Sequence, residues 1–209
     1  DYAGQAADFD GLREVIKGKN ICLIEDAAPG LGAVYKGKTC CSRGDIGITS
    51  FHMAKTFTTV EGGMLFTENE EWNRISRMIR SQGEDPNKKY HFPVLGHNYR
   101  MTDIAAAIGL VQFSRFDEIL NKRRYIAAKY DAAFGKLKNV KIPKIKEGNE
   151  HAYFLYPLLV PNRDKVVAEL KEEGIQINIS WPMPIYEQKV YQPYPHEQCP
   201  VTKHFTESV

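Results

Sequence analysis

Apolar residues in the first part of the chain follow a pattern of short helices and strands. They recur at helical spacing from Phe9 to Ile16, behind Asp8, which is a suitable N-cap. A continuous apolar run over 21–24 then leads into Glu25 and Asp26. Such a run is typical of a strand buried on both faces of a parallel sheet, with Asp26 at its carboxyl end. Weaker patterns predict two further strands, over residues 46–51 and 63–67.

Longer helical patterns follow, on either side of an irregular segment. Thr67 and Glu70 form a capping box that predicts the start of a helix. Residues 81–98 have no regular pattern, which is typical of a segment that carries function or an interface. Thr102 then caps a second helix, and helix-compatible sequence continues over 115–134 as one long or kinked unit. The expected apolar faces are Trp72, Ile75 and Ile79 in the first helix, and Ile104, Ile108 and Val111 in the second.

A polar, lysine-rich connection over 143–149 is the best domain boundary in the sequence. Beyond it, the pattern predicts a strand over 154–160 and a helix over 164–173 that Gly174 ends. Alternating isoleucines over 175–179 predict a second, half-buried strand. The sequence thus predicts a larger first domain and a small α+β second domain. Their expected ranges are 1–140 and 141–209.

Composition and charge narrow the class of protein. With 43% hydrophobic and 26% charged residues the chain is globular, and its net charge of +2 gives no signature of nucleic-acid binding. The longest apolar run, 154–160, is far too short to span a bilayer, and no signal-peptide pattern opens the chain. Cys22, Cys40, Cys41 and Cys199 have neither zinc-site nor disulfide spacing, so we expect a cytoplasmic protein with no metal site.

Two residues stand out for their chemistry. Lys55 lies between two predicted strands, close to aromatic residues and ahead of two glycines. A lysine amine is almost wholly protonated in water at pH 7, whereas a desolvated one becomes a nucleophile for carbonyl groups. Asp26 ends a predicted parallel strand, where α/β enzymes place ligand-binding groups. A lysine with its charge at the surface and a turn-forming aspartate are the plain alternatives, but together the pair suits a pyridoxal phosphate site.

Five sequence blocks, in order, carry a resemblance to a known family. The blocks are Glu-Asp-Ala-Ala at 25–28, Gly-Asp-Ile-Gly at 44–47, Ser50-Phe-His52 with Lys55, Glu-Gly-Gly-Met at 61–64, and 96–103 with Asn98. In these blocks the sequence resembles the pyridoxal-phosphate-dependent nucleotide-sugar aminotransferases of the DegT/DnrJ/StrS type. The match continues through residues 151–156, so that it covers most of the chain.

The resemblance implies a role for each matching residue. Lys55 would hold the cofactor as a Schiff base and then move a proton, while Asp26 would keep the cofactor's ring nitrogen protonated. Ser50 would hydrogen-bond the cofactor phosphate, and Asn98 would reach the cofactor of a partner subunit in a homodimer with shared active sites. His52 either borders the sugar pocket or packs in the interior.

The resemblance also implies the fold and the reaction. The expected fold is α/β of the aspartate-aminotransferase type, with part of a large domain containing a mostly parallel sheet and a smaller α+β domain. The expected reaction transfers an amino group, from glutamate, to a keto group of a nucleotide-linked deoxysugar. Lys55 favours transamination, because related sugar dehydratases carry histidine at this position.

Three departures from the family pattern leave alternatives open. Pro29 replaces the usual glutamine or histidine, and Val60 replaces a small residue before the glycines. The family's N-terminal portion, which binds the phosphate and stacks on the ring, has no counterpart here, and we expect a fragment that also lacks the extreme C-terminus. A silent fragment, a dimerisation module, or a pyridoxal-dependent dehydratase or lyase are therefore alternative hypotheses.

Overall fold

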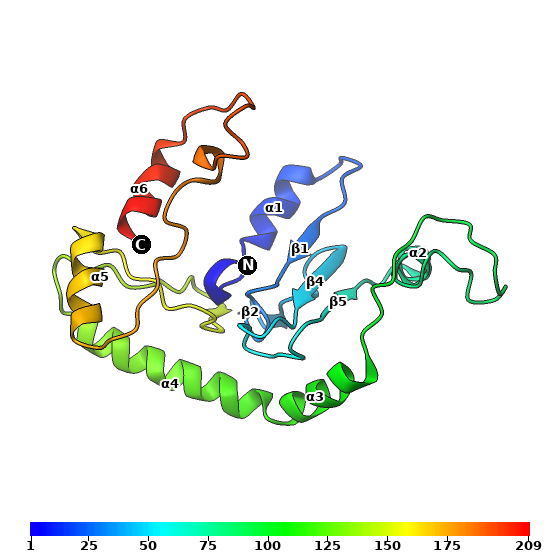
Figure 1. Cartoon of the computed structure of the whole chain (residues 1–209), viewed down its shortest axis with the longest axis horizontal. Helices are drawn as coiled ribbons and strands as arrows, with labels where there is room; N and C mark the ends of the chain where they lie inside the picture. The colour runs from blue at the N-terminus through cyan, green and yellow to red at the C-terminus, as the bar shows by residue number, and fades with distance from the viewer. The chain divides into compact units, whose positions relative to one another are not determined.

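The computed structural model describes residues 1–209, which form two compact units. The first unit comprises residues 1–125 and 145–155, and the second comprises residues 126–144 and 156–209. The division into domains at residue 140 stays a prediction. Figure 1 shows the chain with labels on most of its elements. The elements are α1 (Phe9–Ile16), β1 (Ile24–Asp26), β2 (Val34–Tyr35), β3 (Lys38–Thr39), β4 (Ile46–Ser50), β5 (Gly63–Phe66), α2 (Glu70–Arg80), α3 (Asp103–Ser114), α4 (Phe116–Phe134), β6 (Asn149–Glu150), α5 (Arg163–Glu172) and α6 (Pro200–Ser208), with short 3-10 turns at Tyr2–Gly4 and Ile185–Glu187.

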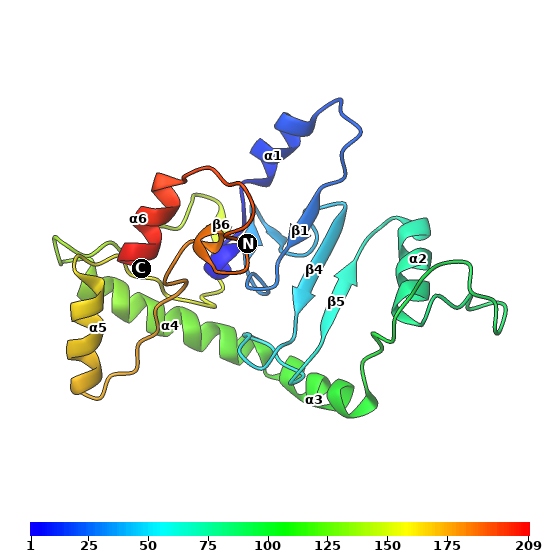
Figure 2. The same cartoon turned by 45° about the horizontal axis from the view of Figure 1, so that its top comes forward.

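The main sheet of the first unit has the strand order β1-β4-β5, and Figure 2 shows the three strands side by side. Strand β1 runs parallel to β4, with Asp26 opposite Ile48. Strand β5 runs antiparallel to β4, with Ser50 opposite Gly63, because the connection between them contains no helix to carry the chain back across the sheet. The α/β class is confirmed, and within this chain the sheet is mixed rather than mostly parallel.

The strand predicted from the apolar run over 21–24 is shorter and more exposed than expected. Strand β1 covers only Ile24–Asp26, and Ile21 and Ile24 are both exposed in this chain. The physical reason is that β1 has a single neighbour, β4, so one edge and part of its faces have nothing packed against them. Burial on both faces is therefore wrong for this chain, whereas the parallel pairing is confirmed.

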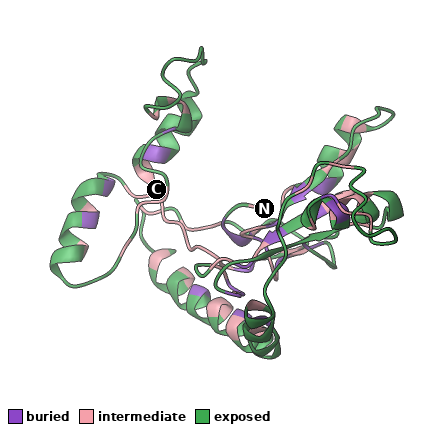
Figure 3. Cartoon of the chain, turned by 45° about the vertical axis from the view of Figure 1, so that its right-hand side comes forward, coloured by how far each residue is buried: buried purple, intermediate pink, exposed green.

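The core of the first unit lies between α1, the small sheet β3-β2-β6 and the start of α4. Phe9 packs edge-on against Tyr35, with the ring centroids 5.6 Å apart. The Tyr35 hydroxyl donates a hydrogen bond to the Asp8 carboxylate at 3.0 Å, which ties the start of α1 to β2. Figure 3 colours the buried residues purple. The members of this core are Ala6, Phe9, Ala27, Ala33, Tyr35, Cys40, Cys41, Leu120 and Ala152.

Glu25 is the most deeply buried acidic residue and organises the loop before β4. Its side chain lies on the face of β1 opposite to Asp26, and only 2% of the residue is exposed. The carboxylate accepts hydrogen bonds from three backbone N–H groups, those of Cys41 at 2.7 Å, Arg43 at 2.7 Å and Gly44 at 3.3 Å. Glu25 thus supplies the hydrogen-bond acceptors for the backbone N–H groups of a partly buried turn.

Two of the three predicted helix N-caps are present in the structure, and the third is a different residue. The Asp8 carboxylate accepts from the backbone N–H of Gly11, and the Thr102 hydroxyl accepts from that of Ala105, so both predicted N-caps are confirmed. The capping box at Thr67 is wrong, because α2 begins later, with Asn69 as its N-cap. The Thr67 hydroxyl instead donates to the Asp45 carbonyl at 2.9 Å and so holds the end of β5.

Helices α3 and α4 are separate helices that break at Arg115, which agrees with the predicted kinked unit. The expected apolar face of α3 is largely uncovered in this chain. Ile104 is 78% exposed and Val111 is 60% exposed, and most of α3 is coloured as exposed in Figure 3.

The second unit is mainly helical. Helix α5 ends ahead of Gly174, whose φ of 77° is the left-handed C-cap conformation that the sequence predicted. The strands predicted over 154–160 and 175–179 are wrong, since neither segment pairs beyond a single bridge between Lys141 and Leu159. A strand needs a hydrogen-bonded neighbour along several successive residues, and neither segment has one. Within the described chain, residues 1–209, no helix combines the length and apolar character that crossing a membrane requires.

Two of the four cysteines are buried and two are exposed, so we expect their thiols to differ in reactivity. Burial, followed by the charge of Glu25, raises the pKa of Cys40 to about 12 and that of Cys41 to about 11. Cys22 and Cys199 are exposed. We expect a thiol reagent at pH 8 to modify these two rapidly, and Cys40 and Cys41 only after unfolding, because thiolates are the reactive form. Peptide mass spectrometry after timed labelling measures this, and rapid labelling of Cys40 in the folded protein would contradict it.

Candidate active site

Three of the predicted site residues come from one edge of the main sheet. Asp26 ends β1 and Ser50 ends the neighbouring parallel strand β4, so both lie at the carboxyl ends of their strands. The backbone N–H of Ala27 donates to the Ile48 carbonyl at 2.9 Å, which continues the parallel pairing past Asp26. Lys55 follows Ser50 by five residues in the connection that leaves this edge. This edge is where open α/β sheets bind their ligands.

Asp26 is exposed at this edge, unlike its neighbour Glu25. One carboxylate oxygen, Oδ1, accepts from the backbone N–H of Ala28 at 3.0 Å, which fixes the orientation of the side chain. Asp26 forms no salt bridge in the described chain, 1–209, so its negative charge is free to pair with a ligand cation. Asp26 can form the turn and bind a ligand at the same time, because the turn uses only Oδ1 and leaves Oδ2 for the ligand.

The loop over 51–62 that carries Lys55 is closed by backbone hydrogen bonds. The backbone N–H of Phe51 donates to the Gly62 carbonyl at 2.8 Å, and the Phe51 carbonyl accepts from the N–H of Thr59 at 2.9 Å. Within it, the N–H of Lys55 donates to the His52 carbonyl at 2.9 Å and forms a tight turn. The position of the Lys55 backbone is therefore determined by the ends of β4 and β5.

The Lys55 side chain is half-buried and lies over the ring of Phe154, with Nζ 4.5 Å from the ring centroid. No carboxylate in the described chain lies within ion-pair distance of this amine. The side chain neither pairs with an acid nor extends fully into water, and the role of Lys55 as a nucleophile stays a prediction. Phe154 was predicted only as the start of a strand, and its contact with Lys55 could not be found from spacing, because about 100 residues separate them in the sequence.

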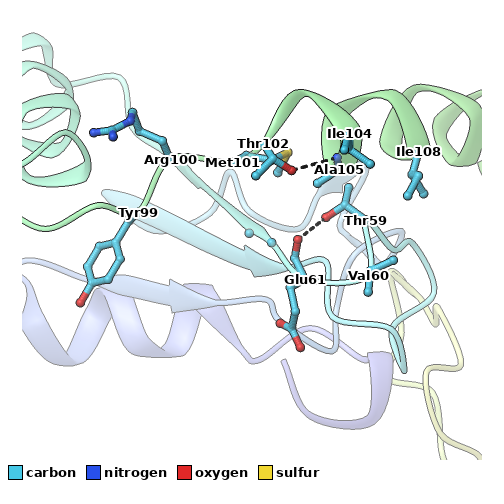
Figure 4. Close-up of a pocket in the computed structure, with 12 residues that line it drawn as sticks. Thr59, Val60, Glu61, Tyr99, Arg100, Met101, Thr102, Ile104, Ala105 and Ile108 are labelled. Carbon is cyan, nitrogen blue, oxygen red and sulfur yellow. Dashed lines mark hydrogen bonds between the residues drawn. The ribbon is translucent and has the colours of Figure 1, made fainter.

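His52 connects the Lys55 loop to a neighbouring pocket. Its Nδ1 accepts from the backbone N–H of Ala54 at 3.2 Å, and its Nε2 lies 3.7 Å from Oε1 of Glu61. His52 is half-buried, so it borders the loop surface rather than packing in the interior. Glu61 lines an open pocket of about 800 Å³, shown in Figure 4. The other lining residues are Thr59, Val60, Gly62, Gly63, Tyr99, Arg100, Met101, Thr102, Ile104, Ala105 and Ile108.

The hydroxyl groups in this pocket hold its backbone. Figure 4 shows the Thr59 hydroxyl donating to the Glu61 carbonyl, at 2.8 Å, and the Thr102 hydroxyl capping α3. The adjacent Thr58 hydroxyl accepts from the backbone N–H of Val60 at 2.9 Å. Val60 has a φ of 72°, a left-handed conformation that is strained for a β-branched residue. The departure at Val60 is thus a conformational one, since a residue without a side chain adopts this φ without strain.

Ser50 lies beside the Lys55 loop, whereas Asn98 lies on an exposed segment next to Ser81. The Ser50 hydroxyl oxygen accepts from the backbone N–H of His52 at 3.3 Å, so it faces the start of the Lys55 loop. Asn98 is exposed and bridges to Ser81, immediately before the pocket residue Tyr99. No hydrogen bond joins Asn98 to Asp26, Ser50 or Lys55 in the described chain. Its predicted role toward a partner subunit stays a prediction.

The residues at this edge have the chemistry that pyridoxal phosphate requires. The cofactor presents an aldehyde, a ring nitrogen that functions when protonated, and a phosphate. Lys55 supplies an amine without an acidic partner, Asp26 supplies an exposed carboxylate held by Ala28, and Ser50 supplies a hydroxyl. Amine, acid and hydroxyl therefore lie at one sheet edge, and the donor set fits this group.

Comparison with known proteins gives the same family as the sequence motifs. The family model for the DegT/DnrJ/EryC1/StrS aminotransferase family matches residues 1–209. The GDP-perosamine synthase of Caulobacter vibrioides is 40% identical over 179 residues, which are 83% of this chain and 48% of that protein. A UDP-4-amino-4,6-dideoxy-N-acetyl-beta-L-altrosamine transaminase of Campylobacter jejuni is 34% identical over 199 residues, 92% of this chain and 53% of that protein.

Solved structures agree with the sequence comparison. The crystal structure of a DegT DnrJ EryC1 StrS aminotransferase from Brucella abortus superposes with a TM-score of 0.92 at 28% identity, covering 100% of this chain and 56% of that chain. The chain thus spans about half the length of the relatives it matches. The sheet edge with Lys55 and Asp26, the matching family model and the shared fold lead to one conclusion: the chain belongs to the DegT/DnrJ/EryC1/StrS aminotransferase family.

Proposed function

We propose that the full-length protein transfers an amino group, with glutamate as the donor, to a keto group of a nucleotide-linked sugar, with pyridoxal phosphate as its cofactor. The observation that carries this proposal is the placement of Lys55, Asp26 and Ser50 at one sheet edge of a member of an aminotransferase family. The two named relatives, a GDP-perosamine synthase and a UDP-aminosugar transaminase, support a nucleotide-activated sugar as the acceptor.

Each residue at the edge has a distinct task in this reaction. The cofactor, when bound, supplies the electron-accepting ring on which amino transfer depends. Lys55 anchors it through its amine and, once displaced by the amino donor, moves the proton at the α-carbon of the donor. Asp26 holds the proton on the ring nitrogen through its carboxylate, and Ser50 binds the phosphate through its hydroxyl. His52, beside Glu61, borders the space that the sugar would occupy.

We also propose that the protein functions in the cytoplasm as a homodimer with shared active sites. Asn98 and the uncovered apolar face of α3 support a shared site, because both lie where this chain alone leaves surface open. Activated sugars and glutamate are cytoplasmic metabolites, which supports the location. Size-exclusion chromatography of the full-length protein with light scattering measures the assembly, and a monomer that retains full activity would contradict the shared site.

Product analysis tests the proposed reaction. The full-length protein, loaded with pyridoxal phosphate, is incubated with glutamate and a keto-sugar nucleotide, and the products are separated by mass. Formation of 2-oxoglutarate together with an aminosugar nucleotide is the expected result. Dehydration of the sugar without incorporation of nitrogen would instead establish the dehydratase alternative, and no reaction at all in the loaded protein would contradict both enzymatic functions.

Replacing Asp26 with asparagine should slow the reaction strongly while leaving the fold intact. Asparagine keeps the oxygen that accepts from Ala28 but carries no charge to hold the proton on the cofactor's ring nitrogen. We expect kcat to fall by about 10² to 10³-fold, as for other losses of a preorganised charge, with little change in thermal stability. Asp10→Asn, at an exposed acid on α1 that pairs with Lys36, is the control. A kcat within about threefold of the unmodified protein would contradict this role.

A further inference from the structure

The charged end of Lys55 lies against the ring of Phe154. The Nζ atom lies over the ring face, 4.5 Å from the centroid, and no carboxylate pairs with it. An ammonium group within about 6 Å of an aromatic centroid is attracted by the negative ring face, and the attraction grows as water is excluded. Both side chains are half-buried, so this contact lies in a partly desolvated place.

The segment that carries Phe154 is anchored on both sides. The backbone N–H of Ala152 donates to the Gly4 carbonyl at 2.7 Å, and that of Leu155 donates to the Ala3 carbonyl at 3.0 Å. From helix α4, the Arg123 guanidinium donates to the carbonyls of Tyr153 at 3.0 Å and Phe154 at 3.4 Å. The Phe154 backbone is therefore fixed by the N-terminal turn and by α4 independently of Lys55.

Tyr153, the residue before Phe154, has a strained backbone conformation. Tyr153 has a φ of 49°, in the left-handed region that aromatic residues rarely adopt. Its backbone N–H donates to Nδ1 of His151 at 2.8 Å, and the two rings lie against each other with centroids 4.3 Å apart. Strained backbone of this kind persists only where the surroundings over-determine it, and it concentrates at functional sites. Here it turns the chain so that the next ring lies under Lys55.

We propose that Phe154 is a positioning residue that holds the Lys55 ammonium whenever the amine is not bonded to the cofactor. The inference rests on the proposed attachment of the cofactor to Lys55. In each cycle the amino donor releases the lysine, and the ring gives the freed side chain one defined resting place beside the sheet edge. Because the ring attracts the ammonium and not the neutral amine, it also competes with the bond to the cofactor. The amount of negative charge on the ring face therefore sets how readily the Lys55 amine bonds to the cofactor.

The test varies the electrostatics of the ring with little change in its volume. Phe154 is replaced by phenylalanine carrying one, two or three fluorine atoms in the full-length protein stripped of cofactor, since fluorine removes negative charge from the ring face. Lysines are then acetylated briefly at one fixed pH, and the labelling rate of each is measured by peptide mass spectrometry. Lys89, whose Nζ lies 4.9 Å from the centroid of the Tyr90 ring, serves as the internal reference because no substitution touches it.

We expect the labelling rate of Lys55 to rise steadily along the series, by about two- to fivefold at three fluorines, while that of Lys89 stays constant. Phe154→Trp, with the strongest ring face, should slow the labelling of Lys55, and Phe154→Leu should speed it as much as the trifluorinated ring. A rate that is flat along the fluorine series, or that follows side-chain volume alone, would overturn the proposal.

A second measurement separates this inference from the proposed function. The same variants are loaded with pyridoxal phosphate and titrated by absorbance, and the dissociation constant of the cofactor should fall along the series by the same factor as the labelling rate rises. Borohydride reduction then identifies the lysine that holds the cofactor. If the adduct is on Lys55 but the labelling rate of Lys55 does not change along the fluorine series, only the role of the ring is overturned. If the labelling rate changes along the series but no adduct forms on Lys55, only the proposed attachment of the cofactor is overturned.

Discussion

Replacing Lys55 with alanine in the full-length protein is expected to abolish amino transfer and the covalent attachment of pyridoxal phosphate. The amine is both the anchor and the group that moves the proton, and no second lysine shares the tight turn over 52–55. Loss of a catalytic nucleophile typically lowers kcat by about 10⁴ to 10⁶-fold. The measurement is borohydride reduction followed by peptide mapping, together with the rate of 2-oxoglutarate formation.

Two further variants make this prediction specific. Lys55→Arg keeps the positive charge over Phe154 but offers no amine that bonds to an aldehyde, so it should be as inactive as the alanine variant. Lys165→Arg, on α5 and paired with Glu169 at 3.8 Å, changes a lysine outside the site and should keep full activity. A pyridoxyl adduct on a lysine other than Lys55 in the unmodified protein would show that the site is assigned wrongly.

Replacing Glu25 with alanine should destabilise the first unit more than any other single change at the sheet. The substitution leaves the N–H groups of Cys41, Arg43 and Gly44 without their acceptor, the first in a buried and the other two in a partly buried place. Unsatisfied buried donors cost about 1 to 3 kcal/mol each, only partly relieved by water, so we expect a loss of about 3 to 5 kcal/mol in the free energy of unfolding. Urea denaturation followed by circular dichroism measures this loss.

Matched variants separate burial from charge at Glu25. Glu25→Gln keeps one accepting oxygen and the shape of the side chain, so it should cost about half as much as the alanine variant. Glu14→Gln removes a charge from an exposed acid that pairs with Lys17, and it should change the free energy of unfolding by less than about 0.5 kcal/mol. Equal stability of the Glu25→Ala and Glu14→Gln proteins would rule out the anchoring role of Glu25.

The local parts of this structure could be predicted because they depend on neighbouring residues. Asp8 and Thr102 cap their helices through N–H groups three residues away, and Gly174 ends α5 through its own backbone conformation. Where two polar residues compete for one cap, local sequence does not decide. Asn69 caps α2 by accepting from the backbone N–H of Trp72, while the Thr67 hydroxyl donates to the carbonyl of Asp45, which lies on a different strand connection, and accepts from the N–H of Asn69.

Prediction failed where a segment needs a distant partner. Residues 175–179 alternate like a strand, yet no neighbouring strand completes the pairing. The same limit applies to the site, since the segment 152–155 that carries Phe154 is held by hydrogen bonds to the carbonyls of Ala3 and Gly4 and by bonds from the Arg123 guanidinium, all from distant parts of the chain.

The sequence by itself determined the family, the order of the helices and of the main-sheet strands in the first unit, and the candidate amine and acid, because motifs and caps are properties of short stretches. Only the tertiary structure decided how deeply each of the two neighbouring acids is buried. Glu25 and Asp26 are adjacent and chemically alike, but alternation along β1 directs the first into the buried loop and leaves the second exposed at the sheet edge. That difference depends on which face of the strand is covered, and coverage comes from residues far away in the chain.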